Sequence, residues 1–230
     1  MMFDATYILV LIGAAISALA ALNVKTTYAR YRKVSTASGL TAEQAAQKIL
    51  NDAGLFDVKI ERIRGDLTDH YSPGEKVLRL SDSVYGSNSV AAIGVAAHEC
   101  GHAIQHDEEY APIKLRSVAV PVANIGSKLS WPIIIAGLLL GIMGLARIGV
   151  ILFTFVVAFQ VITLPVEFDA SSRALRILNE NGMLQPNELD GAKKVLTAAA
   201  LTYVAALFST ILQLLRLIIL VQGGNGKRRS

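Results

Sequence analysis

Residues 94–110, GVAAHECGHAIQHDEEY, bring together side chains that could do chemistry at helical spacing. His98 and His102 are four apart, so in a helix their imidazoles lie one turn apart on the same face. Glu99 points about 100° around the axis, which suits contact with a water molecule better than metal ligation. The pattern is H-E-x-x-H. It predicts Zn²⁺ on the two histidines and a third ligand, with Glu99 as general base toward water at the open position.

A chance occurrence of this pattern on an amphipathic helix is the alternative. The histidines follow VAAIGVAA, a run of apolar and small residues that indicates a buried helix. Burying polar side chains without partners costs kilocalories each. Metal binding is therefore the favoured interpretation.

A tetrahedral site needs a third protein ligand, and two residues are candidates. His106 continues the same spacing, but an ideal helix places it about 6 Å beyond His102 along the axis, which is far for a shared tetrahedral ion. Glu167 follows a long apolar run and begins a segment with helical character. A glutamate on a second helix can complete a His, His, Glu site. We favour Glu167.

The rest of the chain has the composition of a membrane protein. Hydrophobic residues make up 53% of the 230 residues, and the mean hydropathy is +0.46. A membrane-spanning helix needs about 20 apolar residues. Four runs approach that length, namely residues 7–24, 131–146 (extended by the semi-apolar 117–130), 148–166 and 198–215. The second and third runs, separated by Arg147, predict a membrane hairpin with its break at that arginine.

We therefore expect a mainly α membrane protein with about four transmembrane helices and a small α+β zincin-like insertion on the cytoplasmic side. The segments follow from the composition: an anchor with its basic flank (1–33), the α+β segment with the H-E-x-x-H helix (34–116), the hairpin (117–166), a cytoplasmic helix (167–197), a C-terminal membrane helix (198–222) and a disordered tail (223–230).

Local signals define elements inside the polar segments. Thr41 and Gln44 form a capping-box pattern for a helix that stops at Gly54. Alternating residues in 56–63 and 76–81 predict two strands, and Ser87 or Ser89 can cap the H-E-x-x-H helix. The strand 76–81 is either an interior strand or an edge on which an extended peptide could pair. A further helix from Glu167 should stop at Gly182.

Lysine and arginine are richest between the first run and the hairpin, which places that segment in the cytoplasm. With this segment in the cytoplasm, four crossings would place the C-terminus outside. The basic residues at the C-terminus favour the cytoplasm instead, so whether the fourth run crosses the membrane fully stays open. The net charge of +4 reflects this bias and does not indicate nucleic-acid binding, because no basic patch interleaved with aromatic residues occurs. Cys100, the single cysteine, fits a reducing compartment and a packed position in the core.

Four further residues are weaker candidates for the site. His70, Tyr71 and Arg173 could each donate a hydrogen bond to a reaction oxyanion. His106 is expected to support the site or lie at the surface rather than to bind the metal. Each of them is otherwise an ordinary loop or surface residue.

The sequence resembles the YugP-type membrane zinc metallopeptidases, which are similar to the HtpX-type and CAAX-prenyl membrane endopeptidases. The resemblance lies in LTDHYSPGEKVLRLSDSVYGSNSVAAIGVAA, HECGHAIQH and VEFDASSRAL. It implies zinc on His98, His102 and Glu167, with Glu99 as general base. In the wider HtpX-type group an aspartate four residues after the ligand glutamate orients a zinc-binding histidine. Ser171 stands there in this chain and could hydrogen-bond His98 instead.

The expected function is a zinc-dependent endopeptidase, multi-pass in the cytoplasmic membrane. Its active site would face the cytoplasm, and its partners would be the lipid bilayer and membrane protein or peptide substrates. The alternative is a catalytically silent scaffold or assembly factor in which zinc is a structural clamp. Glu99 separates the two, because a structural site does not require it.

Overall fold

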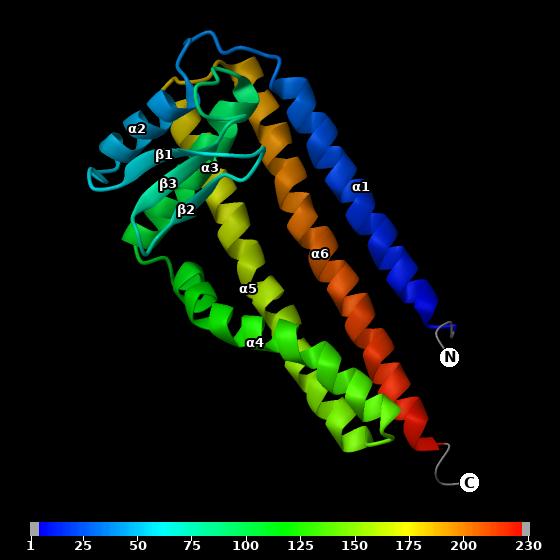
Figure 1. The fold of residues 1–230 in the computed structure, drawn as a ribbon. Coiled ribbons are helices and arrows are strands. Elements are labelled where there is room, and N and C mark those ends of the chain that lie inside the picture. Colours follow the sequence, from blue (N-terminus) through cyan, green and yellow to red (C-terminus); the bar gives the residue numbers. More distant parts are fainter. Residues whose placement is uncertain (1–4, 227–230) are drawn as a thin grey trace. The chain divides into compact units, whose positions relative to one another are not determined.

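The computed structural model describes residues 5–226, and within them the chain is mainly helical (Figure 1). The elements in order are α1 (Tyr7–Tyr31), α2 (Ala42–Asp52), β1 (Lys59–Ile63), β2 (His70–Ser72), β3 (Val77–Ser81), α3 (Val90–Asp107), α4 (Ala111–Leu139), α5 (Met143–Glu180) and α6 (Pro186–Gly226). They form two compact units. We call residues 5–21, 115–164 and 202–226 the apolar unit, and residues 22–114 and 165–201 the site unit.

Four helices, α1, α4, α5 and α6, are long and apolar enough to cross a membrane. The predicted hairpin is present, but its turn lies at residues 140–142 and not at Arg147, which is inside α5. Gly141 has a φ of +70° there, a left-handed conformation that glycine adopts without strain. Arginine is a good helix former, so a charge alone does not end a helix.

Two predicted boundaries also differ from the structure. The helix expected to begin at Glu167 is instead the last part of α5, which begins at Met143, and residues 186–197 are the beginning of α6. Gly182, with a φ of +59°, follows the end of α5 as predicted. Helix α6 continues to Gly226 and so includes the first part of the expected tail; residues 227–230 lie outside the described residues.

The site unit contains a three-stranded sheet in the order β1-β3-β2. Strand β1 runs parallel and β2 antiparallel to β3, with Tyr71 opposite Leu78. The predicted strands are confirmed as β1 and β3, whereas β2, only three residues long, was not predicted. Because β3 is central, the suggestion that it offers a free edge to a peptide is wrong; the edge strands are β1 and β2.

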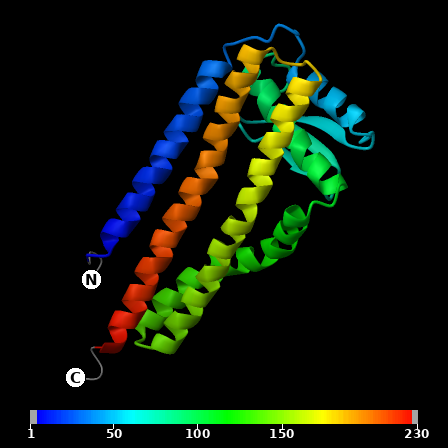
Figure 2. The same cartoon turned by 180° about the vertical axis from the view of Figure 1, so that it is seen from behind.

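Helix α3 lies between this sheet and the part of α5 that follows Pro165 (Figures 1 and 2). Its N-cap is Ser89, whose hydroxyl accepts from the Ala92 N–H at 3.2 Å. Gly101 permits the close approach of α5, because a Cβ there would lie 2.7 Å from the Ala170 carbonyl oxygen. The glycine between the two histidines therefore determines how near α5 can come to them.

Candidate metal site

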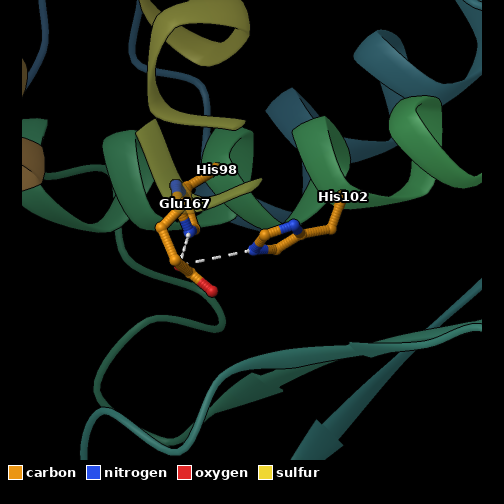
Figure 3. Close-up of side chains that lie close together, drawn as sticks. All are labelled: His98, His102 and Glu167. Carbon is orange, nitrogen blue, oxygen red and sulfur yellow. Dashed lines mark ion pairs between the residues drawn. The ribbon is translucent and has the colours of Figure 1, made fainter. Parts of the chain in front are cut away.

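The structure brings His98, His102 and Glu167 together in the site unit (Figure 3). The Nε2 atoms of His98 and His102 lie 3.4 and 3.7 Å from the same Glu167 carboxylate oxygen. The three side chains are 15%, 12% and 4% exposed, respectively. Ligands about 2.1 Å from a tetrahedral zinc ion are separated by about 3.4 Å, so this donor set fits zinc. The two histidines come from α3 and Glu167 from α5.

The electrostatics of the site favour a cation. Burial lowers the pKa of the His102 imidazole, but the hydrogen bond to Glu167 and the charges of Glu99 and Glu167 raise it more, and the net pKa is raised. The negative charges that favour a proton on His102 also favour a metal ion. A buried carboxylate such as Glu167 would otherwise be costly.

Gln105 fixes the orientation of His102 and is itself fully buried. Its Nε2 donates to the Val166 carbonyl at 2.9 Å and to Asp169 Oδ2 at 2.7 Å. Both partners only accept, so the amide nitrogen must face them and Oε1 must face His102 Nδ1, 3.0 Å away. His102 Nδ1 must then carry the proton, which leaves Nε2 to bind a metal.

Ser171 supports the other histidine. Its hydroxyl lies 3.1 Å from His98 Nδ1. This is the contact that the sequence suggested when serine was found in place of an aspartate. A hydroxyl provides a weaker partner than a carboxylate, but it can still hold the imidazole with Nε2 toward Glu167.

Glu99 is positioned by the sheet. The backbone N–H of Tyr71, on edge strand β2, donates to Glu99 Oε2 at 3.0 Å. Glu99 is 9% exposed. Asp69, just before β2, accepts from the backbone and hydroxyl of Ser81 on β3. Strand β2 is thereby held against β3 and places its Tyr71 N–H at the candidate base.

The weaker candidates His106, His70 and Arg173 do not belong to the cluster of possible metal ligands. His106 is exposed, does not join the metal-ligand cluster, and has its ring centroid 6.1 Å from that of Tyr71. His70 is exposed on β2, with Nδ1 2.9 Å from the Thr68 carbonyl. Arg173 pairs through Nε with Asp169 at 2.5 Å and through Nη1 with Glu108 at 2.6 Å. These ion pairs favour a bracing role for Arg173 over the predicted oxyanion contact.

Sequence reasoning missed the roles of Gln105 and Asp169. Asp169 in fact joins Gln105 to Arg173. A signal for Gln105 was present, because an amide three residues after His102, on a helix whose residues 90–97 are all apolar or small, needs hydrogen-bond partners if it is buried. Cys100 is packed as predicted: it is fully buried with Sγ 3.7 Å from the Ala46 carbonyl, and burial raises the pKa of its thiol.

The cluster of His98, His102 and Glu167 beside the glutamate of the H-E-x-x-H pattern indicates a zinc peptidase. Comparison with known proteins agrees with this class. The model of the family described as "Putative neutral zinc metallopeptidase" matches residues 6–222, so the chain belongs to this family.

Among curated proteins, the chain is similar to the "Putative membrane protease YugP" of Bacillus subtilis (strain 168). The two are 47% identical over 205 residues, which cover 89% of this chain and 91% of the relative. No solved structure shows significant similarity to the chain.

Proposed function

We propose that this protein is a membrane-embedded zinc-dependent endopeptidase whose metal ligands are His98, His102 and Glu167. The observation that carries the proposal is the convergence of both histidine Nε2 atoms on one Glu167 oxygen. Gln105 and Ser171 hold the opposite nitrogens of the two rings, which supports ligation through Nε2. Membership of a family described as putative zinc metallopeptidases also supports the proposal.

In the proposed mechanism Glu99 is the general base. Bound zinc would supply a Lewis acid that activates water and polarises the peptide carbonyl. The Glu99 carboxylate, anchored by the Tyr71 N–H, would take the proton of the attacking water and pass it to the leaving amine. Burial of Glu99 and Glu167 limits competing solvent near the reacting groups.

Glu99→Gln tests the peptidase against the scaffold alternative. We expect the variant to keep its zinc and to lose cleavage of a model protein by about 10²- to 10⁴-fold, as for removal of a general base. Glu109→Gln is the matched control, because Glu109 is exposed and pairs only with Lys114 among the described ion pairs. Wild-type cleavage by Glu99→Gln would contradict the mechanism and favour a structural role for zinc.

The ligand set is tested separately by metal analysis. We expect Glu167→Ala to lose stoichiometric, tight zinc and His106→Ala to retain it. The reverse result would assign the third ligand to His106 and remove the basis for a His, His, Glu site.

We also propose that the site faces the cytoplasm and acts on membrane proteins or peptides near the bilayer. Lysine and arginine are more numerous in the segment between α1 and α4 than in the other segments that connect the apolar helices, which supports this orientation. An epitope inserted after Gly74, in the exposed β2–β3 turn, should be protected in right-side-out vesicles and digested in inverted ones. Digestion only in right-side-out vesicles would reverse the assigned orientation.

A further inference from the structure

A groove of about 480 Å³ runs between the end of α1 and the beginning of α6 in the site unit. The two segments are antiparallel and lie side by side in both views (Figures 1 and 2). They pack closely, since a Cβ at Gly191 would lie 2.8 Å from the Tyr31 ring. The residues where α1 ends therefore face those where α6 begins.

One end of this groove is strongly basic. Its charged lining residues are Arg30, Lys193, Lys194 and Asp190. Lys194 and Asp190 form an ion pair of 2.6 Å. Within the part of the chain that the structure describes, Arg30 and Lys193 make no ion pair with an acid. Two cations are therefore available to a ligand at this end.

The other end of the groove carries no charge. It is lined on α6 by Ala198 and Leu201 and on α1 by Asn23 and Thr27. In the sequence, residues 7–24 and 195–215 are free of charged side chains, so the groove crosses the boundary between charged and uncharged segments on both helices. A basic end followed by an uncharged, partly apolar end matches an amphiphile with an anionic headgroup.

We propose that this groove binds an anionic phospholipid, with the headgroup phosphate held by Arg30 and Lys193 and the acyl chains lying toward Leu201. Basic pockets between membrane helices are suited to anionic lipid headgroups, and each cation near the headgroup contributes about fivefold in affinity. The inference is independent of the proposed peptidase activity.

The test uses the purified full-length protein in detergent, with native mass spectrometry to measure retention of dioleoyl phosphatidylglycerol and dioleoyl phosphatidylcholine. Wild type should prefer phosphatidylglycerol. Arg30→Gln with Lys193→Gln should weaken phosphatidylglycerol binding roughly 25-fold, because two cations are removed. The control, Lys59→Gln with Arg64→Gln, removes the same charge from exposed positions in and after β1 and should bind like wild type.

Two further measurements separate a lipid from a soluble phosphate. Leu201→Asn should weaken phosphatidylglycerol binding and leave the melting temperature unchanged, since Leu201 is 44% exposed. Glycerol 3-phosphate, which has the anion but no chains, should bind much more weakly than the lipid. The proposal is overturned if both lipids bind wild type equally, if the groove variant binds like the control, or if glycerol 3-phosphate binds as tightly as the lipid.

Discussion

The two units of the molecule differ in how far their large hydrophobic side chains are buried. In the apolar unit many lie at the surface: Val118, Leu139 and Phe155 are 74%, 81% and 47% exposed. In the site unit Ile49, Leu80 and Ile93 are at most 1% exposed and belong to one core around α3. One unit thus has a surface suited to lipid, whereas the other has the buried core of a water-soluble domain, and the latter holds the candidate chemistry.

A matched pair of charge substitutions tests this contrast and should have the largest effect. Phe155 lies midway along an uncharged stretch of α5, and Phe56, 77% exposed, lies in the turn before β1. We expect Phe155→Lys to make membrane insertion less favourable by about 3–4 kcal/mol and Phe56→Lys to leave it almost unchanged. The measurement is the membrane-integrated fraction of each variant. Equal insertion would remove the lipid-facing interpretation of the apolar unit.

Within the site unit, the approach of α5 to α3 can be tested at Gly101. Alanine there would collide with the Ala170 backbone, whereas alanine at Gly94 would make ordinary contacts with Ala192, 3.4 Å from its Cβ and 3.7 Å from its Cα. Overpacking of this kind costs about 1–3 kcal/mol. Gly101→Ala should therefore lower the melting temperature and weaken zinc binding by moving Glu167 away from the histidines. If Gly94→Ala has the same effect, the close approach has no special role.

Gln105→Leu removes the amide that joins the two ligand-bearing helices. It leaves His102 Nδ1 without its acceptor, and losses of such supporting contacts weaken metal binding by about 10- to 100-fold. Zinc affinity is measured by competition with a chelator. Gln47→Leu, on exposed α2 surface, should leave it unchanged. An unaltered affinity in Gln105→Leu would show that His102 needs no such support.

Ser171→Ala should have the smallest effect. It removes one contact of 3.1 Å with His98, and a typical hydrogen bond is worth about 0.5–1.5 kcal/mol, or roughly 2- to 12-fold in zinc affinity. The neighbouring Ser172 is exposed, so Ser172→Ala is the control in the same chelator competition. A loss larger than that of Gln105→Leu would reverse the order of the two supports.

The part of the site that depends on local spacing could be predicted from the sequence. His98, Glu99 and His102 follow from the helical repeat, and the placement of Glu167 followed from the geometric limit on His106 and from the family resemblance. The structure brings Glu167 close to both histidines, and its role as a metal ligand stays a prediction. The capping residues Thr41 and Ser89 and the stop at Gly182 were also predictable, because these signals are local.

What was missed depends on contacts between distant segments. Strand β2 is too short for an alternating pattern and is stabilised by its pairing with β3 and by Asp69. Asp169 is only two residues from Glu167, so helical phase alone argued against a shared role, but Gln105 is long enough to reach it. The turn at residues 140–142 was hidden because it lies inside an apolar run.

Cys100 gives the chain a built-in reporter of motion at the site. It is the single thiol, it is fully buried, and it lies on α3 between the two histidines. A thiol reagent can reach it only when the packing around α3 opens, so the labelling rate measures the free energy of that local opening. Any ligand that joins α3 to α5 should slow labelling, whatever reaction the site performs.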